Sequence, residues 1–566
     1  MILGVIFDFD NTIYDYDICN NNGLKKLFQK LNEITFKDEK IIKDLYNNIN
    51  KNIKLSNNVS NKFNKSIYIK KLLEELNISL TYLEEYIKIY NNEFNNNLKI
   101  NDGIIELITL FKKNNIKIGL LSNNIFYQQY EKLKILGILK YFDAIQTSDE
   151  CGEEKPNINT YLNIQNKLGI PFENIAFIGD NFEHDILPSL KLKMLPFYYN
   201  INENINKNIN SPNIFYDENY NNNNYETNIL LKNNYIEFKN FVDLVYFFDK
   251  YFKTIDELIF LSKYFGQSNL NIQGPGGNIS IKLDDIIFIK SSGAVLGNLS
   301  YNEGYCLANN KECLKLLENK KELELKNTKI FGYKIPSMET FFHAFMKKYT
   351  VHIHFTLSNI FFCSNKEFQL ENFPYNYEIV KYIPPGLLLA NAVYEKYSEE
   401  CDVYFLENHG LIITNDNVNI IIEIYENIYK YFNNLLNNKF DDEYNTFLIN
   451  KNYYFNKNRS LVVRYIDYQY EILEKIKYCF PDLAIFIEKI KVISNLEELY
   501  QNLDNYNIII VNKKIYLCAE NLAKVYYLIE LIDKYKILCN YSYENLNMIN
   551  DTKYLQNMEQ EKFRKL

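Results

Sequence analysis

Short apolar runs in the first 180 residues end in polar side chains, and this pattern constrains the fold more than any other feature of the chain. The run "GVIF" is followed by Asp8, Asp10 and Thr12, and the run "IKIGLL" by Ser122 and Asn123. An apolar strand that ends in acidic residues puts carboxylates at the carboxyl edge of a sheet, where open α/β sheets bind their ligands. The pattern predicts an α/β fold with a ligand site at this edge.

Two further motifs follow in the same order. Lys155 precedes a proline in "EEKPN", and the run "NIAFIG" is followed by Asp180 and Asp185. A single aspartate after a strand is often only a cap or turn residue. Four such motifs in this order resemble the haloacid dehalogenase-like hydrolase superfamily over roughly residues 1–250, which implies a Rossmann-like parallel sheet.

This resemblance implies a role for each motif. Asp8 would attack phosphorus and form an aspartyl-phosphate, and Asp10 would act as general acid and base. Asp180 would help hold Mg²⁺ with Asp8 and the backbone carbonyl of Asp10, and Asp185 is a candidate to bind the metal or to support its ligands. The remaining role is binding of the transferred phosphoryl group. The expected phosphoryl-binding residues are Ser122, Asn123 and Lys155.

The segment between the first two motifs has helical periodicity. Its position and size, about residues 17–98, resemble the helical cap of one subgroup (IA) of this superfamily. Because the dehalogenase branch lacks a second acidic residue, Asp10 favours a phosphatase or a phosphomutase. His184 lies beside Asp185, and we expect no metal role for it.

Composition and helical patterns divide the chain. Residues 199–227 are dominated by asparagine and have no apolar period, which predicts a loop. We expect a short strand and a helix within residues 235–252 to close the first domain, and a second helix, at residues 255–266, to open the next and end at a Gly266 cap. The predicted domains are residues 1–252 and 253–566.

Histidine placement is the main feature of the second region. Two of the five histidines, His352 and His354, stand in "TVHIHF", where alternation along a strand would place both on one face. His409 follows the apolar run "VYFL", and we expect Glu339 and His343 one turn apart on a helix. Three imidazoles with an open position can form a catalytic zinc site. Two histidines on a polar sheet face remain the alternative.

Glycine-rich turns precede the histidines in "IQGPGGNISIK" and "IFIKSSGAVLG". Glycines let backbone N–H groups approach an anion, and hydroxyl and amide side chains add donors. A simple hairpin is the alternative for one such turn alone. The turns occur in order with PSxE, HxH and ENHG, and this series resembles the class II aldolase/adducin family from about residue 253 to the C-terminus.

This second resemblance implies an α/β/α domain with bound Zn²⁺. "YIPPGLLLANAV" and the tail, from "CFPDLAIF" to "MEQEKFRKL", fit the branch that includes rhamnulose-phosphate aldolase-like proteins. Family aldolases carry two serines before the glutamate, whereas Met338 follows Ser337 here, so one phosphate-binding hydroxyl is missing. We expect His343 to pack structurally. The implied zinc ligands are His352, His354 and His409, the acid/base is Glu339, and the phosphate-binding residues are Asn278, Ser292, Gly293 and Ser337.

The two resemblances together predict a bifunctional enzyme of sugar-phosphate metabolism, a Mg²⁺-dependent phosphatase joined to a zinc aldolase. A dehydratase joined to a phosphatase, as in methionine salvage, is the first alternative. A non-catalytic, adducin-like second domain is another. Pentulose-phosphate 4-epimerases share the scaffold but place Asp where Glu339 stands. The family also implies a homo-oligomer through the second domain.

Charge and cysteine content restrict partners and compartment. The formal net charge is −8 and no basic block stands out, which disfavours nucleic acid as a partner. Nine cysteines without a CxxC pair favour a reducing cytosol. We identify no signal peptide and no apolar run long enough to span a membrane, so we expect a cytoplasmic protein whose partners are small sugar phosphates.

Overall fold

The computed structural model describes residues 2–55, 62–200, 229–232, 234–332, 334–364 and 369–437, and shorter stretches between 453 and 549. Most of the predicted asparagine-rich loop and the segment "MEQEKFRKL" lie outside these residues. The chain forms two compact units, Met1–Phe252 and Lys253–Leu566. The α/β class predicted from the sequence is confirmed in both units.

The first unit is built on a seven-stranded sheet in the order β3-β2-β1-β4-β5-β7-β6. Every neighbouring pair is parallel except β6 and β7. Because β1 lies between β2 and β4, the polar residues that follow these three strands meet at one edge. The strands are β1 (Gly4–Phe7), β2 (Lys117–Ser122), β3 (Ala144–Thr147), β4 (Ile175–Gly179), β5 (Leu195–Tyr199), β6 (Leu230–Lys232) and β7 (Tyr235–Phe238).

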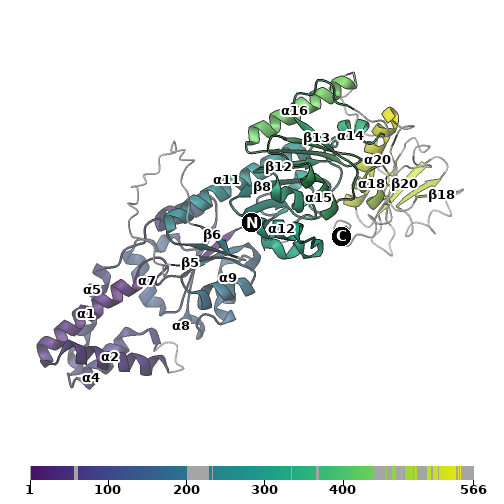
Figure 1. Ribbon diagram of the computed structural model, residues 1–566. Coiled ribbons are helices and arrows are strands. Elements are labelled where there is room, and N and C mark those ends of the chain that lie inside the picture. Colours follow the sequence, from purple (N-terminus) through teal and green to yellow (C-terminus); the bar gives the residue numbers. More distant parts are fainter. Residues whose placement is uncertain are drawn as a thin grey trace. The chain divides into compact units, whose positions relative to one another are not determined.

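Helices of the first unit form two groups. One group packs on the sheet: Tyr161 and Ile164 of α9, for example, are buried against Ile6 and Phe177. The other group lies together, apart from the sheet (Figure 1). The sheet helices are α6 (Ile104–Lys113), α7 (Phe126–Ile135), α8 (Ser148–Cys151), α9 (Ile158–Leu168) and α10 (Leu187–Lys191); the second group is α1 (Tyr16–Thr35), α2 (Glu39–Lys54), α4 (Lys65–Glu75) and α5 (Leu83–Asn96).

Local sequence explains why this second group is helical. In α2 the buried residues Ile42, Tyr46, Ile49 and Ile53 recur every three or four positions, which gives one apolar face. The side chain of Asp38 accepts a hydrogen bond from the Lys40 N–H and caps the helix. The four helices occupy the segment in which a cap was predicted.

The two helices expected around residue 253 are one helix, α11 (Phe241–Gly266). That part of the prediction was wrong because Lys253 and Thr254, between the two expected helices, do not break an α-helix. Gly266 is the last helical residue and does not have positive φ. A Cβ there would lie 2.3 Å from the Gly297 nitrogen, so this glycine permits close backbone approach.

The second unit contains an eight-stranded sheet in the order β11-β10-β9-β8-β12-β15-β14-β13. All neighbouring pairs are antiparallel except β13 and β14. The central strand β12 carries His352, which pairs with Asn278 on β8 and with Ile412 on β15. The strands are β8 (Asn278–Leu283), β9 (Ile286–Lys290), β10 (Tyr305–Asn309), β11 (Lys329–Phe331), β12 (Tyr349–Ile353), β13 (Tyr377–Val380), β14 (Val403–Leu406) and β15 (Gly410–Asn415).

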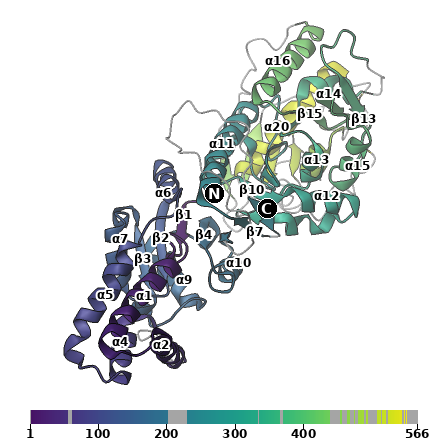
Figure 2. The same ribbon diagram turned by 60° about the vertical axis from the view of Figure 1, so that its left-hand side comes forward.

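Helices cover both faces of this sheet (Figures 1 and 2). One buried core joins Ile289, Phe342 and Ala390, which belong to the sheet, α13 and α15. α16 lies on the other side, where Tyr425 packs against Phe355. This is the predicted α/β/α arrangement. The helices are α12 (Asn310–Glu318), α13 (Thr340–Phe345), α14 (Thr356–Phe362), α15 (Leu387–Glu395) and α16 (Val418–Leu435).

A third sheet, in the order β16-β17-β20-β19-β18, follows these elements in the second unit and was not predicted. Two helices accompany it, and α20 makes contacts with α14, β17 and β20. The elements are β16 (Tyr453–Phe455), β17 (Val462–Ile466), α18 (Pro481–Phe486), β18 (Ile490–Ile493), β19 (Ile508–Val511), β20 (Lys514–Ala519) and α20 (Leu522–Ser542).

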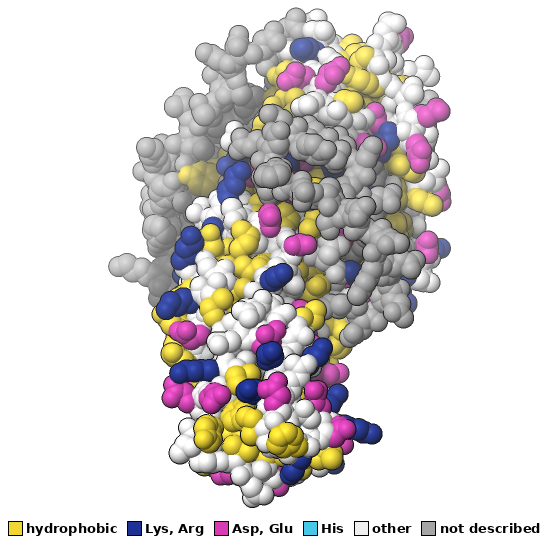
Figure 3. Space-filling view, turned by 90° about the vertical axis from the view of Figure 1, so that its left-hand side faces the viewer, with side chains coloured by type: hydrophobic (Ala, Val, Ile, Leu, Met, Phe, Trp, Pro, Cys, Tyr) yellow, Lys and Arg dark blue, Asp and Glu magenta, His cyan; other side chains and the backbone are white. Residues whose placement is uncertain are grey.

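No helix among the described residues is both long enough and apolar enough to cross a membrane. The face seen in Figure 3 carries lysine and arginine side chains interspersed with aspartate and glutamate.

Replacing Gly277 with alanine should destabilise the protein more than the same change at Gly137. Both glycines have positive φ, +67° and +72°. A Cβ at Gly277 would lie 2.3 Å from Ile272 Cδ1 and 2.9 Å from the His352 oxygen, whereas nothing lies within 4 Å at Gly137. We expect Gly277→Ala to lower the free energy of unfolding by about 1–3 kcal/mol more than Gly137→Ala. If denaturant titration showed equal losses in the free energy of unfolding for the two variants, close contacts of the Cβ at position 277 would not be the cause.

Candidate active sites

Three carboxylates meet at the carboxyl edge of the first sheet. Asp8 follows β1, Asp180 follows β4, and Asp185 lies in the π-helical turn Phe182–Ile186 that comes next. One carboxylate oxygen from each lies within 4.8 Å of the others. Gly179 permits this approach, because a Cβ there would lie 2.5 Å from Asp185 Oδ2. Oxygen ligands of this kind suit a hard divalent cation.

Lys155 is the positive charge of this cluster. Its Nζ lies 2.6 Å from Asp8 Oδ1 and 2.7 Å from Asp185 Oδ1, and all three residues are buried. Burial raises the pKa of Asp8 well above its usual value although Lys155 opposes this, and burial with Asp185 nearby raises the pKa of Asp180 to about 6. Three carboxyl groups thus crowd around one lysine, and a bound cation would favour their charged forms.

Asn123, a predicted site residue, and His184, which was not one, position Lys155. The Asn123 side chain accepts a hydrogen bond from the Lys155 N–H at 2.6 Å and donates to its carbonyl at 3.1 Å. His184 Nδ1 lies 2.7 Å from the same carbonyl. Asn123, predicted to bind phosphate, thus uses its amide on the Lys155 backbone. Ser122 Oγ accepts a hydrogen bond from Gln129.

Donors surround the Asp10 carboxylate. Lys132 Nζ lies 2.9 Å from Oδ1, which Tyr14 also hydrogen-bonds, while Gln129 and Asn124 donate to Oδ2 at 2.9 and 3.1 Å. Burial alone would raise the pKa of Asp10, but Lys132 and these donors lower it. None of these four partners was predicted. Gln129 and Lys132 lie three residues apart on α7. This spacing is common on any helix, so the sequence alone does not indicate that both side chains contact Asp10.

A large cavity of about 1620 Å³ opens onto this cluster within the first unit. Asp8, Asp180 and Lys155 line it, and so do residues of α1, α2, α4 and α5. The cavity gives a substrate access to the carboxylates.

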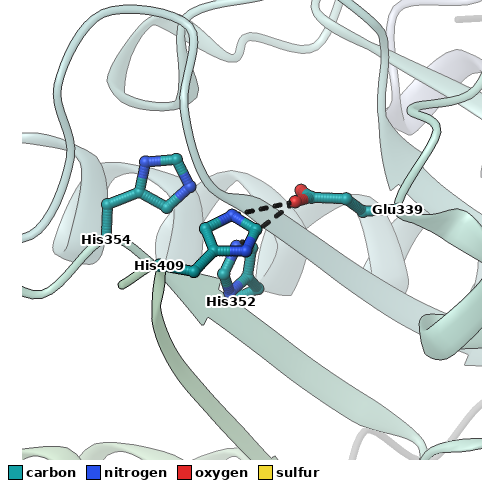
Figure 4. Close-up of side chains that lie close together, drawn as sticks. All are labelled: Glu339, His352, His354 and His409. Carbon is teal, nitrogen blue, oxygen red and sulfur yellow. Dashed lines mark ion pairs between the residues drawn. The ribbon is translucent and has the colours of Figure 1, made fainter. Parts of the chain in front are cut away.

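The second site gathers three histidines and one glutamate (Figure 4). His352 lies on β12, His354 just beyond its end, and His409 in the turn between β14 and β15. The ring centroids are 4.9–5.1 Å apart. Glu339, expected on a helix, is the residue that caps the N-terminus of α13. One ligand atom from each of the four lies within 4.8 Å of the others.

Hydrogen bonds leave imidazole nitrogens available for a metal. His352 Nδ1 donates to the Leu411 carbonyl at 3.2 Å, and His354 Nδ1 lies 2.6 Å from Asp482. The Nε2 atoms of both rings are buried without a hydrogen-bond partner. Buried imidazole nitrogens that point into one cluster with a carboxylate are the donor set that zinc prefers. The described residues therefore fit a zinc ion.

Glu339 is held between two of the rings. Its Oε1 lies 3.5 Å from His352 Nε2 and 3.3 Å from His409 Nε2, and Oε2 accepts a hydrogen bond from Asn278. Burial alone would raise the pKa of Glu339, but His352 and His409 lower it well below its usual value. Burial lowers the pKa of His354 to about 3, although Asp482 opposes this. At neutral pH the glutamate is charged and His354 is neutral.

The predicted phosphate-binding residues of this region share one small cavity beside Glu339. In this conformation it measures about 10 Å³, roughly room for one water molecule. Met338, at the position where family aldolases have a second serine, also lines it. A phosphate would need side chains to move. The predicted residues in its lining are Asn278, Ser292, Gly293 and Ser337.

The C-terminal segment supplies contacts that were not predicted. Asp482 comes from α18, and Lys534 of α20 donates to the His354 carbonyl at 2.9 Å. Asn408, next to His409, donates to the Cys479 carbonyl at 2.7 Å. These residues lie at least 70 positions from the histidines in sequence, so no local spacing could have connected them.

His343 lies outside the metal cluster. Its Nδ1 is 2.7 Å from Ser280 Oγ and its ring stacks on Phe342. This placement agrees with structural packing.

Comparison with known proteins gives two family matches. Residues 5–195 match the haloacid dehalogenase-like hydrolase model, and residues 256–431 match the class II aldolase and adducin N-terminal domain model. Both family resemblances predicted from the sequence are confirmed.

Curated relatives match the first region. The chain is 26% identical over 205 residues to a glyceraldehyde 3-phosphate phosphatase of Methanocaldococcus jannaschii, covering 34% of this chain and 83% of the relative. It is 25% identical to a ribulose-1,5-bisphosphate 5-phosphatase of Halopiger xanaduensis, covering 33% and 80%. A glyceraldehyde 3-phosphate phosphatase of Methanothermobacter thermautotrophicus is 41% identical, but over only 34% of its length and 13% of this chain.

Solved structures resemble each region. A haloacid dehalogenase-like phosphatase from Thermococcus onnurineus is 19% identical, with a TM-score of 0.31, covering 43% of this chain and 96% of its own. An N-terminal class II aldolase domain from Thermoplasma acidophilum is 26% identical, with a TM-score of 0.29, covering 32% and 93%.

Replacing Lys155 with methionine should destabilise the protein, because two buried carboxylates lose their counter-charge. We expect a loss of about 3–5 kcal/mol in the free energy of unfolding at neutral pH without added metal. Lys167→Met is the control: Lys167 pairs with Glu150 at 3.0 Å at an exposed position and should cost about 0–1 kcal/mol. Similar losses for both variants in urea titration would show that the buried pair contributes nothing.

Proposed function

Because the chain joins a haloacid dehalogenase-like hydrolase region to a class II aldolase and adducin region, we propose that it is a bifunctional cytosolic enzyme. Residues 1–252 would release phosphate from a sugar phosphate with Mg²⁺, and residues 253–566 would cleave a ketose phosphate with Zn²⁺. Two clusters carry this proposal, one of three carboxylates and one of three histidines with a glutamate, because the candidate ligand atoms in each lie within 4.8 Å of one another. Matches to sugar-phosphate phosphatases support the first activity.

In the first domain we assign the nucleophile to Asp8. Its carboxylate would attack phosphorus and form an aspartyl-phosphate while the bond to the sugar oxygen breaks. Lys155, 2.6 Å from Asp8, would stabilise the charge that gathers on the phosphoryl oxygens. Mg²⁺, when bound, supplies further charge neutralisation, and Asp8, Asp180 and Asp185 are the side chains that would hold it.

Asp10 would protonate the leaving sugar oxygen and then accept a proton from water as the aspartyl-phosphate is hydrolysed. Its carboxylate oxygens are occupied by Lys132, Gln129, Asn124 and Tyr14 in this structure. The proposed role therefore requires Asp10 to leave these donors for the substrate.

In the second domain His352, His354 and His409 would hold zinc. Zinc, when bound, acts as a Lewis acid that polarises the ketone and hydroxyl oxygens of a ketose. Glu339, whose Oε1 lies 3.3–3.5 Å from two of the imidazoles, would take and return a proton near these oxygens. Asn278 would position Glu339 through its hydrogen bond to Oε2.

We predict that Asp8→Asn abolishes phosphate release while zinc binding by the second domain persists. The amide cannot act as the nucleophile, and the histidine cluster belongs to another compact unit. Phosphate release from a panel of sugar phosphates, with products identified by mass, tests this. Asp149→Asn, at a position outside the carboxylate cluster, is the control and should remain active. Full activity of Asp8→Asn would remove Asp8 as the nucleophile.

We also predict that His352→Ala loses most of the zinc affinity, whereas Glu339→Gln keeps zinc and loses turnover in the second domain. The histidine would be a ligand, and the glutamate would be needed for proton transfer. Zinc content by metal analysis and product masses measure both effects; cleavage gives two smaller carbonyl compounds and dehydration gives loss of water.

Two further variants make this test specific. Asp482→Asn should weaken zinc binding about 10–100-fold, since its carboxylate orients His354 at 2.6 Å. Asp285→Asn removes only an exposed pair with Lys311 and should bind zinc normally. Wild-type protein that stays metal-free in excess zinc would remove the proposed lyase and favour the adducin-like alternative.

A further inference from the structure

The cavity of the first unit has a second charged wall besides the catalytic cluster. Lys54, at the end of α2, and Lys65, at the start of α4, both line it, together with Lys62. Asp8 and Lys155 line the same cavity. One substrate could therefore contact both walls.

The surroundings of Lys65 act on its positive charge in opposite directions: the Tyr46 hydroxyl and the nearby aromatic rings stabilise the charge, whereas burial and the neighbouring lysines disfavour it. Lys65 is the first residue of α4, where the helix dipole is positive, and its Nζ hydrogen-bonds the Tyr46 hydroxyl at 3.2 Å. The Tyr68 ring centroid is 5.2 Å from this Nζ. Burial, with Lys54 and Lys132 nearby, lowers the pKa of Lys65 to about 8.

Three lysines of the cavity have carboxylate partners, whereas Lys65 shares the lack of a described ion pair with Lys25, Lys40, Lys43 and Lys54, which also line it. Lys155 pairs with Asp8, Lys132 with Asp10 and Lys62 with Glu154. Among the described residues, no carboxylate forms an ion pair with Lys65. The acidic residues that also line the cavity away from the catalytic cluster, apart from Glu154, are Asp17, Glu39 and Glu131.

The missing counter-charge points to a ligand. An anion beside Lys65 would offset the neighbouring Lys54 and Lys132 and the dipole of α4 together. Ser66, the next residue of α4, also lines the cavity, and its hydroxyl can donate a hydrogen bond to such an anion. Rings of Tyr46 and Tyr68 would shield the contact from water and strengthen it.

We propose that Lys65, with Lys54 and Ser66, binds a second anionic group of the phosphatase substrate, at the end of the molecule away from the phosphate that is released. This inference rests on the proposed phosphatase activity and adds the substrate class: a sugar phosphate with a second phosphate or a carboxylate. Both a phosphate and a carboxylate present a negatively charged oxygen that an ammonium group can bind.

The test compares matched substrate pairs on the full-length protein with Mg²⁺. Fructose 1,6-bisphosphate against fructose 6-phosphate reports a second phosphate, and 3-phosphoglycerate against glyceraldehyde 3-phosphate reports a carboxylate. The measured quantity is kcat/KM for the doubly anionic substrate divided by kcat/KM for the other member of the pair. We expect the wild type to favour the doubly anionic member of one pair, and that pair identifies the group.

Lys65→Met should lower this ratio about tenfold, mainly through KM, because a charged hydrogen bond to the distal group is lost. Lys65→Arg keeps the charge and should keep most of the preference. Lys70→Met is the matched control, because Lys70 lies on the same helix, pairs with Glu74 and does not line the cavity. It should leave the ratio unchanged.

Lys54→Met, at an exposed position, gives a second measurement if Lys65→Met does not fold, and it should also lower the ratio. A wild type without preference in either pair, or a preference that survives both Lys65→Met and Lys54→Met, would overturn the inference. Absence of phosphate release from every substrate, including p-nitrophenyl phosphate, would instead overturn the proposed phosphatase.

Discussion

Burial of charge at strand ends is the constraint on which both candidate sites depend. An ionised carboxylate taken out of water is costly unless charges and hydrogen bonds compensate it. In the first unit Lys155 compensates Asp8 and Asp185, and Asn123 and His184 fix the Lys155 backbone. The parallel sheet supplies the edge at which these groups meet. The polar groups at this edge of the sheet are therefore arranged around Lys155.

In the histidine site a different set of residues compensates a buried carboxylate. Glu339 is buried, and two imidazoles and the Asn278 amide surround its carboxylate. The contacts behind the site come from Asp482, Lys534 and Cys479, whereas the family match ends at residue 431. A fragment limited to the matched residues would lack the carboxylate that orients His354. The C-terminal segment is thus part of the site's structure.

Sequence patterns predicted the parts of the fold and sites that are local. Asp8 and Asp180 follow apolar runs, and His352 and His354 are two residues apart, so the strand positions were visible in the sequence. The break expected in α11 was wrong because a change of domain need not interrupt a helix. Lys132 near Asp10 and Asp482 near His354 could not be predicted, since tertiary packing alone brings them together.

The two lysine environments of the first unit suggest how the cavity could use binding energy. Lys155 contacts Asp8 and Asp185, so in the proposed reaction its charge would act on the transferred phosphoryl group. Lys65 lies on α4 and not on the sheet that carries Asp8, so under the proposed function its contacts would be made to a part of the substrate other than the transferred phosphoryl group. Binding at a remote group can stabilise the arrangement of helices around the substrate and exclude water from the reacting end. An anionic group of the proposed substrate would supply the counter-charge that no described carboxylate gives to Lys65.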